Sequence, residues 1–222
     1  MKYFKNGNKR LEQGDYQGAI IDLTKAIQIN PQLGSAYYNR AVARGQLQDS
    51  HGAIADFTKA IQFNPKDAEA YYNRGVARGQ LNDNQGAIAD FTKVIQINPK
   101  LAIAHYNRGV LRGQLKDNQG AIADFTKAIQ INPKLAIAYY NRGVTRNQLK
   151  DYQQAIVDFT KAIQVNPKLA VAYHNRGVAR GLSGDKQRAI ADLRKAVSLF
   201  QQQGNKAQAQ KTLELIARVS SK

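Results

Sequence analysis

Residues 68–101 read AEAYYNRGVARGQLNDNQGAIADFTKVIQINPKL, and residues 102–135 read AIAHYNRGVLRGQLKDNQGAIADFTKAIQINPKL. Only five of the 34 positions differ between these two segments. The same frame extends back over residues 34–67 and 1–33, the latter one residue short, and forward over residues 136–169 and 170–203. Self-similarity at a fixed period of this length is the signature of repeat architectures. The sequence therefore predicts six repeats, followed by a tail of residues 204–222.

Each repeat contains two helical patterns joined by a polar turn. In the third repeat we expect helices over residues 69–81 and 85–97, separated by the turn residues 82–84. The second helix should end at Asn98, because the residue before a proline is biased away from helical geometry. Ala87, Phe91 and Val94 recur on one side of this helix as an apolar face. Two short amphipathic helices cannot bury such faces alone, so the repeats are expected to stack into an all-α solenoid.

The repeat resembles the tetratricopeptide repeat over residues 1–203. That family has an aromatic residue at repeat position 4, small residues at 8, 20 and 27, an aromatic at 24 and proline at 32. In the third repeat these positions hold Tyr71, Gly75, Ala87, Val94, Phe91 and Pro99. The pattern is also similar to bacterial, notably cyanobacterial, repeats. The resemblance implies a right-handed superhelical α-solenoid of six helix-turn-helix repeats, and residues 204–222, with an apolar stripe and a polar face, should form a C-terminal capping helix.

The sequence offers little for catalysis or metal binding. There is no cysteine, and His51, His105 and His174 fall at three different repeat positions, so they cannot form an i, i+4 metal pair. Twelve of the sixteen carboxylates occupy only two repeat positions, one in the turn and one within the second helix. A turn aspartate is the residue expected to cap a helix start. We therefore expect no enzyme activity, no cofactor and no metal, and we expect the glycines at positions 8, 12 and 19 to serve close packing.

Two rows of arginine are the unusual feature of the repeat. They occupy positions 7 and 11, where the family usually has an apolar and an aromatic residue. Partly buried guanidinium groups must be paired. One interpretation is an internal ladder, in which the second-helix aspartate pairs with them, as Asp90 would with Arg74. The alternative is a row that binds an anionic ligand, since one aspartate stands against two arginines. The arginines are Arg40, Arg74, Arg108, Arg142 and Arg176 at position 7, and Arg44, Arg78, Arg112, Arg146 and Arg180 at position 11.

The resemblance also implies a concave groove lined by positions 2, 5, 6, 9 and 13 of the first helices. Asparagine can donate and accept hydrogen bonds to any peptide backbone, and tyrosine gives contact area at low entropic cost. The leading hypothesis is a protein–protein interaction scaffold that binds a peptide or protein partner in this groove. The family's carboxylate clamp is not expected, because position 2 lacks lysine. The candidate binding residues are Tyr38, Asn39, Tyr72, Asn73, Tyr106, Asn107, Val110, Tyr140, Asn141 and Asn175.

The charge supports a second hypothesis. Lysine and arginine number 33 against 16 acidic residues, a net charge of +17, of which residues 1–101 carry +4 and residues 102–222 carry +13. An electrostatic binder of nucleic acid or another polyanion through the basic C-terminal half is therefore the alternative function. A third interpretation is an accessory domain of an enzyme whose catalytic part lies elsewhere.

Neither a membrane-spanning stretch nor a signal peptide is evident, so a cytoplasmic location is expected. The uncapped N-terminal end is a surface that could support self-association.

Overall fold

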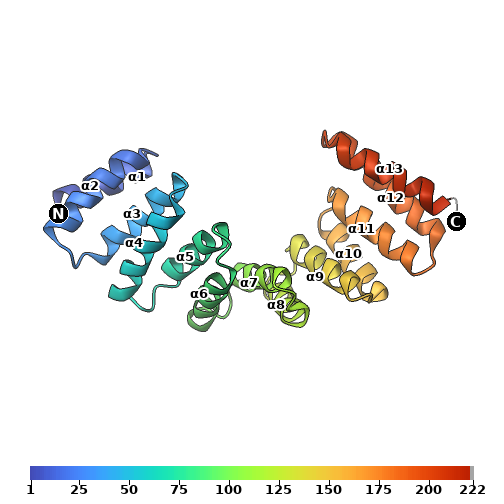
Figure 1. Ribbon diagram of the computed structural model, residues 1–222, viewed down its shortest axis with the longest axis horizontal. Coiled ribbons are helices and arrows are strands. Elements are labelled where there is room, and N and C mark those ends of the chain that lie inside the picture. Colours follow the sequence, from blue (N-terminus) through green and yellow to red (C-terminus); the bar gives the residue numbers. More distant parts are fainter. Residues whose placement is uncertain (221–222) are drawn as a thin grey trace. The chain divides into compact units, whose positions relative to one another are not determined.

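The computed structural model describes residues 1–220, which fold into thirteen α-helices arranged as antiparallel pairs joined by short turns (Figure 1). Two compact units, Met1–Leu111 and Arg112–Lys222, divide the chain within α7. The predicted helix at the C-terminus is present as α13, and its last two residues lie outside the described part of the chain. The helices are α1 (Lys2–Glu12), α2 (Tyr16–Ile29), α3 (Gly34–Gln46), α4 (Ser50–Phe63), α5 (Ala68–Gln80), α6 (Asn84–Ile97), α7 (Ala102–Gln114), α8 (Asn118–Ile131), α9 (Ala136–Gln148), α10 (Tyr152–Val165), α11 (Ala170–Leu182), α12 (Lys186–Gln202) and α13 (Lys206–Ser220).

The predicted helix boundaries of the third repeat are confirmed to within one residue. Helix α6 begins after Asp83, whose carboxylate accepts a hydrogen bond from the Gly86 N–H at 2.9 Å. It ends at Asn98, where the backbone is no longer helical before Pro99. The Asn98 side chain then accepts a hydrogen bond from the Lys100 N–H at 3.2 Å, which holds the turn into α7. A side-chain cap therefore fixes the start of the second helix, and an Asx turn holds the chain directly after its end.

The turn inside each repeat contains a residue in the left-handed conformation. This residue is Gln48, Asn82, Lys116 or Lys150 in the second to fifth repeats, with φ between 61° and 64°, and Gly14 or Gly184 in the first and sixth repeats, with φ of 77° and 94°. At the end of α3, Asp49 N–H bonds the Arg44 carbonyl at 2.9 Å and Gln48 N–H bonds the Gly45 carbonyl at 3.0 Å. These two bonds are the Schellman pattern, which satisfies the last carbonyls of the helix. The chain reverses here at a conformational cost of about 1–2 kcal/mol for each residue that is not glycine.

In the unit of residues 1–111, the second helices supply the core. Helix α4 packs against α3 of its own repeat and α5 of the next, while α3 also contacts α5. Phe57 of α4 lies between Ala41 of α3 and Ala70 of α5 and is almost fully buried. The edges of Tyr38 and Phe57 meet with ring centroids 5.6 Å apart. Each aromatic core residue therefore joins two repeats.

The repeated glycines have three different roles, so the prediction that all serve close packing is only partly right. At position 8 it is confirmed, because a Cβ on Gly75 would lie 3.2 Å from the Phe91 ring. At position 12 it is wrong for Gly45 and Gly79, where a Cβ would meet nothing within 4 Å, whereas a Cβ on Gly113 or Gly181 would lie at an ordinary contact distance of 3.8 Å from an alanine Cβ. At position 19, a Cβ on Gly86 would press against the capping carboxylate of Asp83.

In the unit beginning at Arg112, the same packing recurs and ends on α13. Phe159 of α10 is fully buried and lies against Ala155 and Ala179. At the end of the described chain, α13 packs on α12 and covers Phe200 through Ala209. The last helix thus buries the apolar face that a following repeat would otherwise cover.

Candidate functional site

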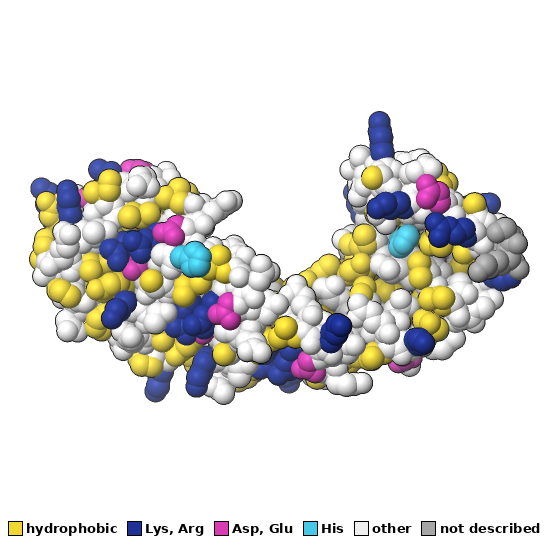
Figure 2. Space-filling view, viewed as in Figure 1, with side chains coloured by type: hydrophobic (Ala, Val, Ile, Leu, Met, Phe, Trp, Pro, Cys, Tyr) yellow, Lys and Arg dark blue, Asp and Glu magenta, His cyan; other side chains and the backbone are white. Residues whose placement is uncertain are grey.

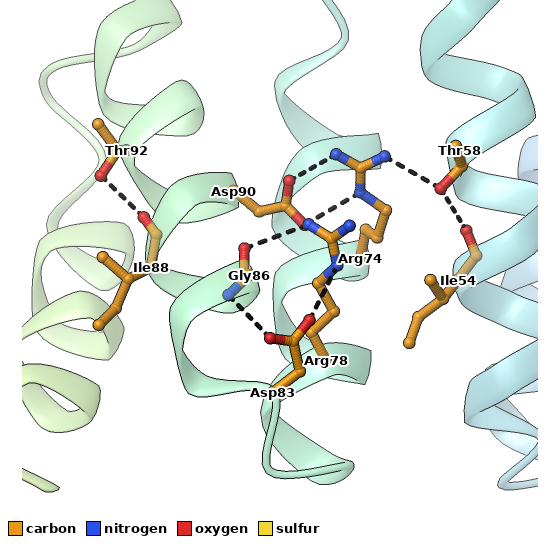
Figure 3. A network of polar contacts seen from close by, with 9 residues as sticks. All are labelled: Ile54, Thr58, Arg74, Arg78, Asp83, Gly86, Ile88, Asp90 and Thr92. Carbon is orange, nitrogen blue, oxygen red and sulfur yellow. Dashed lines mark hydrogen bonds and ion pairs between the residues drawn. The ribbon is translucent and has the colours of Figure 1, made fainter. Parts of the chain in front are cut away.

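The arginines of the two rows form polar networks with aspartates of the second helices, and Figure 3 shows the network of the third repeat. In the third repeat, Arg74 donates to both carboxylate oxygens of Asp90, with Nε–Oδ2 at 3.0 Å and Nη2–Oδ1 at 2.6 Å. The side chains of Arg74 and Asp90 are only 11% and 3% exposed. The face of Tyr71 lies 5.4 Å from the guanidinium carbon of Arg74. The arginine at position 7 is therefore held by a bidentate ion pair and an aromatic ring.

The second arginine of the repeat binds the same carboxylate. Arg78 Nη1 lies 2.8 Å from Asp90 Oδ2 and 3.2 Å from the carbonyl oxygen of Gly86, and Arg78 Nε lies 3.5 Å from Asp83. The charges of two arginines and two aspartates thus cancel within the repeat. We call this network the Arg–Asp clasp. The predicted internal pairing is confirmed for Arg74 with Asp90 and recurs as Arg40 and Arg44 with Asp56, Arg112 with Asp124, Arg142 and Arg146 with Asp158, and Arg176 and Arg180 with Asp192.

The clasp also reaches the preceding repeat, through a threonine that the sequence analysis missed. Arg74 Nη1 donates to Thr58 Oγ1 at 3.0 Å, and the Thr58 hydroxyl donates to the Ile54 carbonyl of α4 at 2.7 Å. Arg74 therefore joins α4, α5 and α6. The signal was present, since threonine stands at position 25 in each of the first five repeats. The equivalent bonds are Arg40 to Thr24, Arg108 to Thr92, Arg142 to Thr126 and Arg176 to Thr160.

The candidate tyrosines and asparagines are brought together in pairs between repeats. Asn73 Nδ2 donates to the Tyr38 hydroxyl at 3.2 Å, and Asn107 Nδ2 donates to the Tyr72 hydroxyl at 3.1 Å. In the second unit, Asn175 Nδ2 donates to the Tyr140 hydroxyl at 3.0 Å. Sequence reasoning missed these pairs, whose members stand 35 residues apart. At least one amide N–H of each of these asparagines is therefore engaged within the protein.

The remaining candidates lie on the same helices. Asn39 donates to the Asn8 side chain at 2.7 Å. Asn141 lies on α9 and is partly buried, as Tyr106 and Val110 are on α7.

Three hollows follow the first helices of the unit 1–111. The largest, about 520 Å³, is lined by Tyr38, Ala68, Glu69, Tyr72, Asn73, Asn98, Leu101 and Ile103. A second, about 300 Å³, lies over Gly45 and beside Val76, and a third, about 360 Å³, lies over Gly79 and is bordered by Tyr106, Asn107 and Val110. The open space above Gly45 and Gly79 therefore belongs to these hollows. Six of the ten candidate residues line them.

A chain of hydrogen bonds enters the largest hollow. Tyr38 accepts from Asn73 and donates to Glu69 Oε2 at 3.2 Å. Burial of the phenol, followed by the negative charges of Glu69 and Asp67, raises the pKa of Tyr38 to about 12. The Tyr38 hydroxyl therefore keeps its proton and remains a donor to Glu69 at neutral pH.

In the second unit, His174 stands at position 5 of the sixth repeat, where the four preceding repeats have tyrosine. His174 Nδ1 lies 3.0 Å from Thr212 Oγ1 of α13, and the Thr212 hydroxyl donates to the Gln208 carbonyl at 2.7 Å. Because the Thr212 proton is used in that bond, His174 Nδ1–H is the donor to Thr212. Burial lowers the pKa of His174. His105 stands at position 4 of the fourth repeat, which is normally aromatic. Its Nε2 atom is hydrogen-bonded to the Pro99 carbonyl oxygen at 3.1 Å.

Two further kinds of feature are absent from residues 1–220. No group of three or more His, Asp or Glu side chains in this range is placed to hold a metal ion. Within the same range, none of the helices combines the length and the apolar character needed to cross a membrane.

Comparison with known sequences agrees with this architecture. A tetratricopeptide repeat profile matches residues 68–101, 102–135 and 136–169, a second TPR repeat profile matches 7–48 and 44–82, and another tetratricopeptide repeat profile matches 170–203. The chain belongs to the tetratricopeptide repeat family, whose scaffold is typically non-catalytic and typically binds proteins or peptides. No curated protein matches the chain.

Solved structures of bacterial tetratricopeptide repeat proteins share the fold. MamA of Desulfovibrio magneticus is 22% identical, covering 77% of this chain and 96% of its own, with a TM-score of 0.72. YrrB, described as having an unusual peptide-binding site, is 22% identical, covering 86% and 97%, with a TM-score of 0.73. The C-terminal part of a repeat protein from Cytophaga hutchinsonii is 18% identical, covering 98% and 88%, with a TM-score of 0.85.

Proposed function

We propose that this protein is a binding module that holds an extended peptide segment of a partner on its first-helix face. We define this face, separately for each of the two units, as positions 2, 5, 6, 9 and 13 of the second to sixth repeats. The hollows along α3, α5 and α7 support the proposal, because they are lined by phenol, amide and small apolar side chains. Such groups contact a peptide backbone whatever its sequence. The described peptide-binding site of YrrB, a protein of the same fold, is consistent with it.

The observation that carries the proposal is the charge of this face. In a chain of net charge +17, the first-helix face contains no lysine or arginine, and Glu69 is its single ionisable carboxylate. The arginines behind it are neutralised in the Arg–Asp clasps. In Figure 2, acidic side chains visible on the unit 1–111 mostly lie beside basic ones. A face of this composition suits a neutral backbone rather than a polyanion.

The test begins with the selection of peptides that bind the whole chain from a random display library. The affinity of the selected peptides is then measured for two variants, each with a lysine introduced on a different helix face. Val76 is 37% exposed and borders two hollows, so Val76→Lys should weaken binding of the selected peptides about tenfold or more, by filling the hollow and adding an unpaired charge. The matched control is Ala89→Lys, which adds the same charge at an exposed position of the second helix in the same repeat. Equal loss in both variants would contradict binding on the first-helix face.

A second candidate function, polyanion binding, is supported by a different set of residues. Lysine occupies position 26 of every repeat, on the second helices, and all six side chains are exposed. None of them forms an ion pair with a carboxylate among the described residues. These lysines are Lys25, Lys59, Lys93, Lys127, Lys161 and Lys195.

Replacement of Lys127, Lys161 and Lys195 by glutamine separates the two functions. If the lysines bind a polyanion, affinity for single-stranded DNA should fall and its dependence on salt should become shallower. Peptide binding should be unchanged. Unaltered DNA affinity in the triple variant would remove this candidate.

A further inference from the structure

The junction between the second and third repeats departs from the repeat sequence at two positions. Position 34 is leucine in the first, third, fourth and fifth repeats but Asp67 in the second. Position 2 is serine, isoleucine or valine in the other repeats of the first-helix face but Glu69 in the third. Neither residue belongs to a clasp or to the cap of a second helix. Glu69 accepts a hydrogen bond from the Tyr38 hydroxyl at 3.2 Å, and the negative charge of Asp67 also contributes to the raised pKa of this phenol.

The hollow at this junction is built of two kinds of surface. Glu69, which is exposed, stands at its edge with the phenols of Tyr38 and Tyr72. Ala68, Leu101 and Ile103 supply apolar surface to the same hollow. At about 520 Å³ it is large enough for one long side chain. A carboxylate and aromatic rings beside an aliphatic wall are the complement of a long cationic side chain, whose stem is apolar and whose head is charged.

Two successive hydrogen bonds in the hollow donate toward the Glu69 carboxylate. The amide of Asn73 donates to Tyr38, and Tyr38 donates to Glu69, so the chain of donors ends on the carboxylate. A carboxylate accepts several hydrogen bonds, so Glu69 retains acceptor capacity beyond the phenol. At the next junction, Tyr72 likewise accepts from Asn107, but Ile103 stands where the carboxylate would be. The acidic end is therefore a property of this junction alone within the first-helix face.

We propose that the hollow between Tyr38, Glu69, Tyr72 and Ile103 binds the side chain of a lysine or arginine from the partner peptide. The stem of that residue packs on the apolar wall, and its charged head lies between the Glu69 carboxylate and the tyrosine rings. The partner is then a segment with a basic residue among neutral or apolar ones. The inference rests on the proposed peptide-binding function and adds its specificity.

The net charge of the whole chain opposes the binding of a basic probe, which makes the test specific for the local site. A net charge of +17 repels cations, so preference for a basic probe must come from the local site. At about 0.15 M salt the Debye length is about 8 Å, which screens the distant lysines but not groups in contact. The probes are acetyl-Gly-Lys-Gly-amide and acetyl-Gly-norleucine-Gly-amide, which differ only in the charged head. Both are titrated into the whole chain, and binding is followed by NMR shifts of the amides of residues 67–73.

We expect the lysine probe to bind about five- to tenfold more tightly than the norleucine probe, the effect of a cation–π contact with a partly exposed ion pair. Glu69→Gln should remove most of this preference, because only the cation–π contact remains, and should leave the norleucine affinity unchanged. Glu214→Gln, which removes an exposed carboxylate from α13, is the matched control and should keep the preference. Asp67 is left unchanged, because its side chain caps α5 through the Ala70 N–H.

Two results overturn the inference in distinguishable ways. If both probes bind residues 67–73 equally, or Glu69→Gln keeps the preference for lysine, the basic-residue site is refuted while peptide binding on the first-helix face stands. If neither probe shifts these amides, and the library-selected peptides also shift none on the first-helix face, the proposed function fails together with the inference.

Discussion

Asp90 receives hydrogen bonds from two arginines one helical turn apart on α5, Arg74 at 2.6 and 3.0 Å and Arg78 at 2.8 Å. Like charges at this spacing on a helix normally repel by a few tenths of a kcal/mol. Here the shared carboxylate lies between them and Asp83 adds a second negative charge, so the cluster is neutral. The arginines therefore stabilise the helix pair instead of forming a free cationic row.

Asp90→Asn should destabilise the protein by about 2–4 kcal/mol, because two partly buried guanidinium groups lose their counter-charge. The free energy of unfolding in urea measures this. Asp83→Asn is the control: its side chain is 52% exposed, and asparagine also caps helices, so its cost should stay below about 1 kcal/mol. Equal losses in the two variants would contradict a clasp centred on Asp90.

Thr58→Val should weaken the coupling between the second and third repeats. The change keeps the side-chain shape but removes the acceptor of Arg74, at a cost of about 1–2 kcal/mol. A double-mutant cycle with Arg74→Lys gives the interaction energy of the pair. A coupling near zero would mean that the bond between repeats contributes nothing to stability.

Lys150→Gly should stabilise the protein by about 1 kcal/mol. Lys150 has φ of 63°, which glycine adopts without a steric penalty. Urea unfolding again provides the measurement, with Lys150→Ala as the control, since alanine keeps the Cβ and should give no such gain. Stabilisation by alanine as large as that by glycine would show that removal of the lysine charge, and not the backbone, is responsible.

Phe159→Ala should cost about 3–5 kcal/mol, because the ring is fully buried and its removal leaves a cavity. Phe63→Ala removes a ring that is 40% exposed and should cost clearly less. Repeat proteins couple mainly to nearest neighbours, so hydrogen exchange should accelerate most in α9 to α11. Uniform acceleration over the whole unit that begins at Arg112 would contradict this expectation.

Acidification should loosen α13 through His174. Burial lowers the folded-state pKa of His174 below its ordinary value of 6.5, so the unfolded chain takes up the proton first. The free energy of unfolding should therefore fall as the pH drops from about 7 through the folded-state pKa. His174→Tyr, which restores the residue of the preceding repeats, should flatten this pH dependence, whereas His51→Gln at an exposed position should not. An unchanged pH profile in His174→Tyr would exclude this histidine as the cause.

The sequence by itself determined the repeat period, the helix pairs and their boundaries. These features depend on neighbours along the chain: Asp83 caps the helix that follows it, and Asn98 stands before a proline. The pairing of Arg74 with Asp90 was also predictable, because a buried guanidinium requires an anion and the repeat offers one in its second helix.

Only the tertiary structure decided which repeats touch through which atoms. Thr58 meets Arg74, and Asn73 meets Tyr38, across 16 and 35 residues of sequence, at positions set by how one helix pair stacks on the next. The same stacking leaves open space over Gly79, where close packing was expected, and brings Glu69 to a phenol of the preceding repeat. Periodicity assigns each residue to a face of its helix, but the distance between two faces depends on the volumes packed between them.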